Sequence, residues 1–268
     1  MPILHIVIPV YNEQDTLAEC LERIHAAAIP AGWQKHLIIV DDASTDGTAR
    51  VLEVVTEATI VAHTVNMGKG AALLTGFDVI LGTLRSSADP GHGTPATPAD
   101  DASDRQHLVI IQDADMEYDP ADYAALLAPC ISEQAQVVYG NRFGLHRSFN
   151  RFRERLHMWG NRLLTMISNF FTGQRVRDME CCYKVFDLDV LRRLRPMLTE
   201  PGFGIEPQMT AAVSRLGIRI VNVPIHYTPR KFDEGKKIKW SDAVWALPVM
   251  WREWCITRQY HRTQGGGS

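Results

Sequence analysis

Apolar runs and amphipathic repeats alternate along the first 111 residues of the chain. Short runs rich in β-branched residues predict buried strands at residues 4–10, 37–40, 60–62 and 108–111. Helical spacing fills the gaps between these strands, beginning at Asp15 or Thr16, at about Thr48, and again over residues 71–84. Strands that alternate with helices predict an α/β fold with a mostly parallel sheet flanked by helices.

The apolar periodicity stops over residues 86–105, where Ala, Asp, Ser and Pro dominate. This composition predicts a flexible surface insertion. It does not predict a domain boundary, because the strand at residues 108–111 resumes the same alternation. We therefore expect one α/β domain over residues 1–240, an amphipathic helix over residues 241–262, and a flexible tail over residues 263–268.

Two apolar stripes in the second half of the chain have helical spacing. The first comprises Phe149, Phe152, Leu156, Trp159, Leu163, Met166 or Ile167, and Phe170. The second comprises Val244, Leu247, Trp251 and Trp254, with Ser241 as the N-cap and a kink expected at Pro248. Arginines lie beside the first stripe, and arginines with Trp and Phe are typical of helices at a membrane surface. The same pattern also fits helices packed on the core, and the sequence leaves both interpretations open.

The overall composition says little about binding partners, but the distribution of charge along the chain says more. A net charge of −3 gives no reason to expect nucleic acid as a partner. Residues 142–177 nevertheless carry eight arginines and one acidic residue. A block this basic favours an anionic surface or an anionic ligand.

The cysteines and the lack of a long apolar run bear on the cellular compartment in which we expect the protein. The five cysteines show no CxxC spacing, so we expect no disulfide framework and a reducing cytosol. The adjacent Cys181 and Cys182 are expected to pack in the core. Met1 leads directly into a strand, and no apolar run approaches the roughly 18 residues of a membrane-spanning helix. These features favour a cytoplasmic location.

Polar residues follow each of the four predicted strands. They are Tyr11, Asn12 and Glu13, then Asp41 and Asp42, then residues 66–70, and finally Asp113 and Asp115. In parallel α/β sheets, ligands bind beyond the carboxyl ends of the strands. A folding core does not require these side chains, so their convergence predicts a binding site at that edge.

The segment from Asp113 to Glu117 is the strongest candidate for a metal site. In an extended segment, Asp113, Asp115 and Glu117 would point the same way. Carboxylates without His or Cys favour Mg²⁺ or Mn²⁺, and such an ion would bridge the two phosphates of a donor. The alternative is an Asx turn that caps a helix beginning near Pro120.

Two other strand ends suggest contacts to a nucleotide. A turn and N-cap account for residues 44–48, but not for the paired Asp41 and Asp42, which could bind a nucleobase edge or ribose hydroxyls. Residues 66–70 lack the P-loop pattern. Their Lys69 either assists a diphosphate or lies on the surface of a tight turn. Further along, Arg142, Arg230 and the pair Lys236-Lys237 suit phosphate oxygens.

Together, the motifs at residues 7–13, 40–48, 66–70 and 113–115 resemble inverting glycosyltransferases of family two with the Rossmann-like GT-A fold. The second half is similar to the dolichyl- and polyprenyl-phosphate glycosyltransferases, which include dolichyl-phosphate mannose synthases. The matching segments are residues 140–143, 178–186, 203–207 and 230–240. The resemblance spans nearly the whole chain except the insertion and the tail.

The resemblance implies a role for each matching residue. The donor nucleotide sugar would contact Pro9, Tyr11, Glu13, Asp41, Asp42, Asn66, Lys69, Gly70, Asp113 and Ala114. Asp113, Asp115 and Glu117 would hold Mg²⁺ or Mn²⁺, although Gln is common at the position of Glu117 in the mannose synthases. Asp115, Asp178, Arg142 and Arg230 would act in catalysis, the two arginines on donor or acceptor phosphates.

The implied reaction transfers mannose or glucose from GDP-mannose or UDP-glucose to polyprenyl or dolichyl phosphate, with inversion. A phosphate acceptor is already ionised and needs no general base. A saccharide or other hydroxyl acceptor would need one, for which Asp178 and Glu180 are the candidates. A non-catalytic subunit that binds nucleotide sugars is a third interpretation. For the lipid acceptor we expect peripheral attachment to the cytosolic face of a membrane, with a separate membrane subunit as a further candidate partner.

Overall fold

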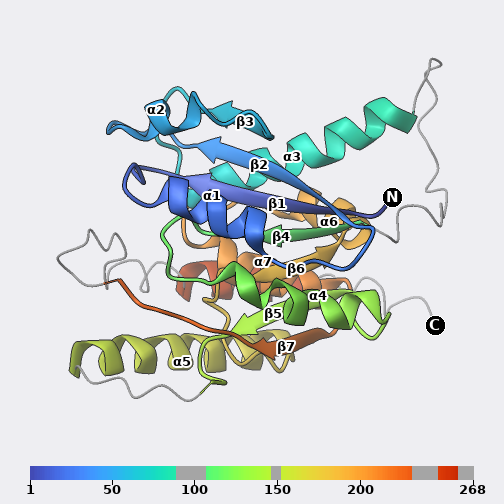
Figure 1. Ribbon diagram of the computed structural model, residues 1–268. Helices are drawn as coiled ribbons and strands as arrows, with labels where there is room; N and C mark the ends of the chain where they lie inside the picture. The colour runs from blue at the N-terminus through green and yellow to red at the C-terminus, as the bar shows by residue number, and fades with distance from the viewer. Residues whose placement is uncertain (89–106, 146–151, 231–246, 259–268) are drawn as a thin grey trace.

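The structure, a computed structural model, describes residues 1–88, 107–145, 152–230 and 247–258. Seven strands form one sheet in the order β3-β2-β1-β4-β6-β5-β7 (Figure 1). The strands are β1 (Ile3–Val10), β2 (Gln34–Asp41), β3 (Ala58–Ala62), β4 (Leu108–Ile111), β5 (Val137–Asn141), β6 (Lys184–Asp187) and β7 (Ile220–Pro224). The mostly parallel α/β sheet predicted from the sequence is therefore confirmed.

The direction of the strands sets the position of the site. β1 pairs in parallel with β2 and β4, and β2 pairs in parallel with β3. β6 is antiparallel to both β4 and β5, and β7 is parallel to β5, so β6 alone of the seven strands is reversed. The carboxyl ends of β1, β2, β3 and β4 consequently meet at one edge of the sheet.

Helices cover both faces of this sheet. They are α1 (Leu17–Ala26), α2 (Thr48–Leu52), α3 (Lys69–Ala88), α4 (Tyr123–Ile131), α5 (Phe152–Thr172), α6 (Leu188–Leu194) and α7 (Ile205–Arg215), with short 3₁₀ turns η2 (Pro120–Asp122) and η3 (Arg195–Met197). Consecutive residues of the central strands, such as Ile6, Val7 and Ile8, are fully buried. Burial of both strand faces explains why these runs are uniformly apolar.

The predicted strands lie where expected, and the bounds of β4 agree with the prediction. β2 begins three residues earlier than predicted, at Gln34, and α3 extends to residues 69–88. The structure adds β5, β6 and β7, which the sequence pattern did not reveal. Gly140, Lys184 and Asn222 interrupt the apolar residues of these strands, which also lie outside the region of regular strand–helix alternation.

The first apolar stripe lies on α5, at the end of the sheet opposite β3 (Figure 1). Its described members Trp159, Leu163, Met166 and Phe170 are exposed, while Leu164 on the other side of the helix is buried. Of the second stripe, Leu247 and Trp251 are exposed on a helix that continues to residue 258. The described parts of both stripes therefore present exposed apolar side chains, whereas Ile167 packs against the core.

Several predicted segments lie outside the described residues. They are residues 89–105 of the insertion, Phe149 of the first stripe, Ser241 and Val244 of the second, Lys236 and Lys237, and the tail. Residues 86–88, which were assigned to the insertion, instead complete α3. Within the described part of the chain, no helix is both long and apolar enough to cross a bilayer.

Candidate functional site

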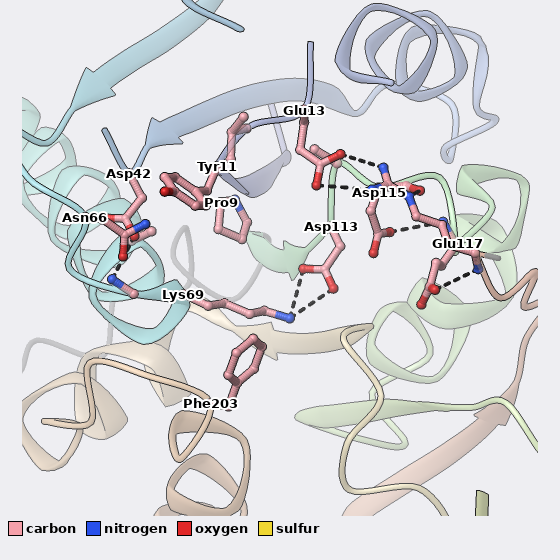
Figure 2. Close-up of a pocket in the computed structure, with 15 residues that line it drawn as sticks. Pro9, Tyr11, Glu13, Asp42, Asn66, Lys69, Asp113, Asp115, Glu117 and Phe203 are labelled. Atoms are coloured by element: carbon pink, nitrogen blue, oxygen red, sulfur yellow. Dashed lines mark hydrogen bonds and ion pairs between the residues drawn. The ribbon is translucent and has the colours of Figure 1, made fainter. Parts of the chain in front are cut away.

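A cavity of about 340 Å³ opens at the carboxyl ends of β1, β2 and β4, beside the start of α3 (Figure 2). Its predicted lining residues are Pro9, Tyr11, Glu13, Asp42, Asn66, Lys69, Asp113, Ala114, Asp115, Glu117 and Arg230. Four other residues predicted for the site do not line it: Asp41, Gly70, Arg142 and Asp178. Segments from four strand ends thus converge on one cavity, as the position of polar residues in the sequence predicts.

The DxD segment is not extended, contrary to the expectation from alternating side chains. It forms a turn in which Met116 has a φ of 61°, and Asp115 Oδ1 accepts a hydrogen bond from the Glu117 amide at 3.0 Å. Asp119 caps the following 3₁₀ turn by accepting from the Ala121 amide. The Asx turn considered as the alternative is therefore present, and it forms the wall of the cavity rather than replacing a site.

The electrostatics of this turn are those of crowded carboxylates. Burial, followed by the charges of Asp113 and Glu117, raises the pKa of Asp115 to about 7. The Glu117 carboxylate accepts from the Tyr227 hydroxyl at 2.7 Å and from the Arg230 amide at 2.9 Å. Glu117 is thereby turned toward the segment that carries Arg230.

The positions of these carboxylates decide whether they can hold a metal ion. Within the described residues, no three His, Cys, Asp or Glu side chains are grouped so that they could hold a metal ion as they stand. Asp113 and Asp115 nevertheless fit a hard divalent cation. Burial and the charges of Asp113 and Glu117 disfavour the ionised form of Asp115, and a bound cation would stabilise that form. Their role as metal ligands, and that of Glu117, remains a proposal.

Lys69 crosses the cavity from α3 to Asp113 (Figure 2). Its Nζ lies 2.9 Å from Asp113 Oδ1 and 3.0 Å from Oδ2, and 18% of its side chain is exposed. Burial opposes the charge of Lys69, but Asp113 holds the pKa of this ammonium well above its usual value. The interpretation of Lys69 as a surface residue of a tight turn is therefore wrong.

Arg230 joins the DxD turn to the end of β1. Its Nη2 lies 2.5 Å from Glu13 Oε2, and its Nε donates to the Asp115 carbonyl at 2.7 Å. Glu13 and Arg230 are 217 residues apart in sequence. This ion pair fixes one side of the cavity and places a guanidinium beside the carboxylates.

Both acids at the end of β2 organise the backbone. Asp42 accepts hydrogen bonds from the Met67 and Gly68 amides at 2.8 and 2.7 Å, and its Oδ1 lies 2.7 Å from His63 Nδ1. Asp41 accepts from the amide and hydroxyl of Ser44, away from the cavity. Asp42 is thus the acid that borders the cavity, and His63 supports it. Sequence reasoning did not single out His63.

The glycines near Lys69 make room for another segment of the protein. Gly68 has a φ of 97°, and a Cβ at Gly70 would lie 2.2 Å from the Glu200 carbonyl. Gly70 therefore acts through packing and does not line the cavity. The segment it contacts leads to Phe203, which does line the cavity and was not predicted as a site residue. Its motif at residues 203–207 was the available signal.

Arg142 and Asp178 form a buried pair beside the cavity. Arg142 donates from Nε and Nη2 to the two Asp178 oxygens at 2.7 and 2.8 Å, and the Asp178 side chain has no exposed surface. The Arg142 guanidinium also lies over the Tyr227 ring, whose hydroxyl binds Glu117. The pair is therefore connected to the DxD turn through one tyrosine.

Comparison with known proteins agrees with this geometry. The family model described as Glycosyl transferase family 2 matches residues 5–84, which span β1 to α3. These residues contain the predicted donor residues from Pro9 to Gly70, but not the DxD turn.

Curated relatives match over most of the chain. It is 28% identical over 225 residues to Glycosyltransferase AglJ of Haloferax volcanii, covering 84% of this chain and 63% of the relative. It is 27% identical over 236 residues to an undecaprenyl-phosphate 4-deoxy-4-formamido-L-arabinose transferase of Klebsiella pneumoniae, covering 86% and 61%. A polyprenol monophosphomannose synthase of Mycolicibacterium smegmatis is 26% identical over 240 residues, with 86% and 79% covered. The chain spans about three fifths of the length of the first two relatives.

The fold also matches solved structures. Glucosyl-3-phosphoglycerate synthase from Mycobacterium tuberculosis, in complex with Mn²⁺, uridine diphosphate and glucosyl-3-phosphoglycerate, superposes with a TM-score of 0.61. The identity is 20%, and the match covers 94% of this chain and 80% of the synthase. The same synthase has been solved with Mg²⁺ and uridine diphosphate. At this identity, the likeness establishes the fold.

Proposed function

We propose that this protein is a glycosyltransferase that moves a hexose from a nucleoside diphosphate sugar to a polyprenyl phosphate. The observation that carries the proposal is the single cavity that collects Tyr11, Asp42, Lys69 and the Asp113-Ala-Asp115 turn. The names of relatives that act on undecaprenyl phosphate and polyprenol support the choice of acceptor. The donor is mannose or glucose on GDP or UDP.

Different residues of the cavity would contact different parts of the donor. Asp42 and Tyr11 lie at the β2 and β1 ends, where the base and ribose would bind, and Lys69 provides a cation for the diphosphate. Asp113 and Asp115, with Glu117 as a third ligand, would hold Mg²⁺ or Mn²⁺, which neutralises the charge on the leaving diphosphate. Arg230 keeps the turn and Glu13 in position and adds a positive charge.

The acceptor side is consistent with a nucleophile that needs no general base. Asp178 is held by three hydrogen bonds from Arg142, two from the guanidinium and one from the backbone amide, and is fully buried, so it is not free to take a proton from an acceptor hydroxyl. A phosphate monoester is ionised at neutral pH and attacks the anomeric carbon directly. A single displacement inverts the configuration at that carbon.

One observation favours a second candidate, transfer to a hydroxyl acceptor. Burial and the charge of Glu206 raise the pKa of Glu180 to about 7, which suits a general base. Its Oε1 is buried and accepts no hydrogen bond from any described residue. If the acceptor is a hydroxyl, Glu180 rather than Asp178 is the base.

The exposed stripes supply a means of reaching a lipid acceptor. Trp159, Leu163, Met166 and Phe170 form a row on α5, and Trp251 continues the apolar surface through Phe171, with ring centroids 6.2 Å apart. Arg162 lies on the same helix. Aromatic side chains beside arginine favour the boundary of an anionic bilayer. We propose peripheral binding to the cytosolic face, with a separate membrane subunit as a further partner.

The function is tested by incubating the protein with Mn²⁺ or Mg²⁺, polyprenyl phosphate, and a panel of GDP and UDP sugars. Mass spectrometry should identify a polyprenyl monophosphate hexose, and NMR should show the inverted anomer. Product formed only with a saccharide or other hydroxyl acceptor would favour the second candidate. Donor binding without turnover on any acceptor would instead support a non-catalytic binding subunit.

Asp115→Ala should reduce turnover by at least roughly 10³-fold, because it removes a carboxylate assigned to the metal. Thermal unfolding measured by circular dichroism should show that the variant still folds. Retention of turnover in the folded variant would contradict the assignment of Asp115.

A further inference from the structure

Behind the cavity, four charged side chains form a continuous chain. Asp113 contacts Lys69, and Lys69 Nζ lies 3.5 Å from Glu206 Oε1. The other oxygen of Glu206 is bound by Lys184, which is fully buried and also donates to the carbonyls of Met179 and Cys181. Two carboxylates and two ammonium groups therefore alternate from the cavity into the core.

One atom in this chain is not satisfied. Glu206 is 2% exposed, and its Oε1 is buried without a hydrogen-bond partner among the described residues. A buried carboxylate oxygen normally accepts a hydrogen bond, because leaving it without one is unfavourable. Lys69, whose Nζ lies 3.5 Å from this oxygen, is held instead on both oxygens of Asp113, at 2.9 and 3.0 Å (Figure 2). Lys69 therefore hydrogen-bonds Asp113 and makes only a longer ion pair, at 3.5 Å, with Glu206 Oε1.

The position that Lys69 occupies is the one that a metal ion would need. Its ammonium lies directly on the carboxylate of Asp113, one of the two proposed ligands. A divalent cation bound there would repel an ammonium at the same oxygens. Glu206 offers a second carboxylate that can accept Lys69 while Lys184 holds Glu206 in place.

We propose that Lys69 is a built-in competitor of the metal: its ammonium pairs with Asp113 unless a divalent cation binds there, and then shortens its ion pair with Glu206 Oε1 to a hydrogen bond. Glu206 is then a positioning residue that acts through Lys69. This inference rests on the proposed function in one respect, the assignment of Asp113 and Asp115 to a metal. It adds that metal binding and the position of Lys69 are coupled.

The test measures Mn²⁺ binding to the full chain without nucleotide, by the electron paramagnetic resonance signal of free Mn²⁺. Lys69→Met should bind Mn²⁺ roughly tenfold more tightly than the unaltered protein, because the competing ammonium is gone. Lys69→Gln should act in the same direction. Arg23→Met makes the same change of net charge at an exposed position on α1 and should leave Mn²⁺ affinity unchanged.

Glu206→Gln tests the second position. It should weaken Mn²⁺ binding several-fold when Lys69 is present, roughly the effect of losing one partly buried ion pair. In the Lys69→Met background the same substitution should have no effect, whereas a merely structural role would lower affinity in both. If Glu206→Gln does not fold, the two Lys69 variants still show whether Lys69 competes with the metal.

Unchanged or weaker Mn²⁺ binding in Lys69→Met and Lys69→Gln would overturn the proposal, including the case in which no protein binds Mn²⁺. Failure of the proposed metal site has a different signature. In that case Asp115→Ala would bind Mn²⁺ as well as the unaltered protein does.

Discussion

At the scale of single residues, much of the hydrogen-bonding capacity around the cavity serves the protein itself. Asp42 holds the turn after β3 by accepting from two backbone amides, and Glu13 is paired with Arg230. Such internal bonds fix the side chains before a ligand arrives, which lowers the cost of ordering them on binding. They also mean that a substitution in the site acts on stability as well as on binding.

Gly70 is a residue near the cavity at which a substitution should change stability. Gly70→Ala should lower the free energy of unfolding by about 1–3 kcal/mol, because its Cβ would meet the Glu200 carbonyl at 2.2 Å. Urea unfolding followed by circular dichroism measures the change. Gly82→Ala on the same helix is the control, since a Cβ there meets nothing within 4 Å, and it should be neutral or stabilising. Equal stability of the two variants would refute the packing role of Gly70.

At the scale of elements, α5 has two faces with different environments. Leu164 is buried, and Ile167 and Phe171 pack against the core, whereas Phe170 is 81% exposed. An exposed row of large apolar side chains is uncommon on a protein surface unless it contacts another phase or partner. The basic residues near this helix favour an anionic surface.

Phe170→Glu should therefore reduce binding to vesicles containing phosphatidylglycerol by roughly tenfold at low salt, because it replaces an exposed ring that would insert into the bilayer with a charge of the same sign as the lipid. Co-sedimentation measures the bound fraction. Val54→Glu introduces the same charge at a position that is 79% exposed, near α2, and should bind vesicles normally. Equal loss in both variants, or no loss in either, would exclude α5 as the membrane contact.

At the scale of the whole molecule, the two ends of the sheet have opposite chemistry. The carboxyl ends of the strands hold the acidic cavity, and the amino ends hold His5, His36 and His107. His5 Nδ1 lies 3.0 Å from His36 Nδ1, and the His5 and His107 rings are 5.9 Å apart. Burial, then the charges of His36 and His107, lowers the pKa of His5 to about 3.

This histidine cluster predicts sensitivity to acid. Between the ordinary pKa of 6.5 and about 3, the unfolded chain binds a proton at His5 that the folded protein does not, so stability falls as the pH falls. The slope is about 1.4 kcal/mol per pH unit for one proton. His5→Leu should reduce the slope by roughly this amount in urea unfolding between pH 4.5 and 6. An unchanged slope would show that other groups dominate.

How far the sequence predicts this protein differs between its elements. Strand positions and the polar strand ends followed from apolar runs, because burial on both faces demands them. The geometry of the DxD segment did not follow, since a turn with a positive φ at Met116 depends on hydrogen bonds to Asp115 and on the segment that carries Arg230. The three strands after residue 131 were not recognised, because Gly140, Lys184 and Asn222 interrupt their apolar residues.

The sequence by itself determined the α/β sheet and the edge at which polar residues gather, because both follow from local periodicity and from the rule for parallel strands. Only the tertiary structure decided that Lys69 lies on Asp113, that Phe203 closes the cavity, and that Arg142 and Asp178 form a pair beside it. These contacts join segments tens to hundreds of residues apart. Their geometry depends on how helices and loops pack on the sheet, which no local pattern encodes.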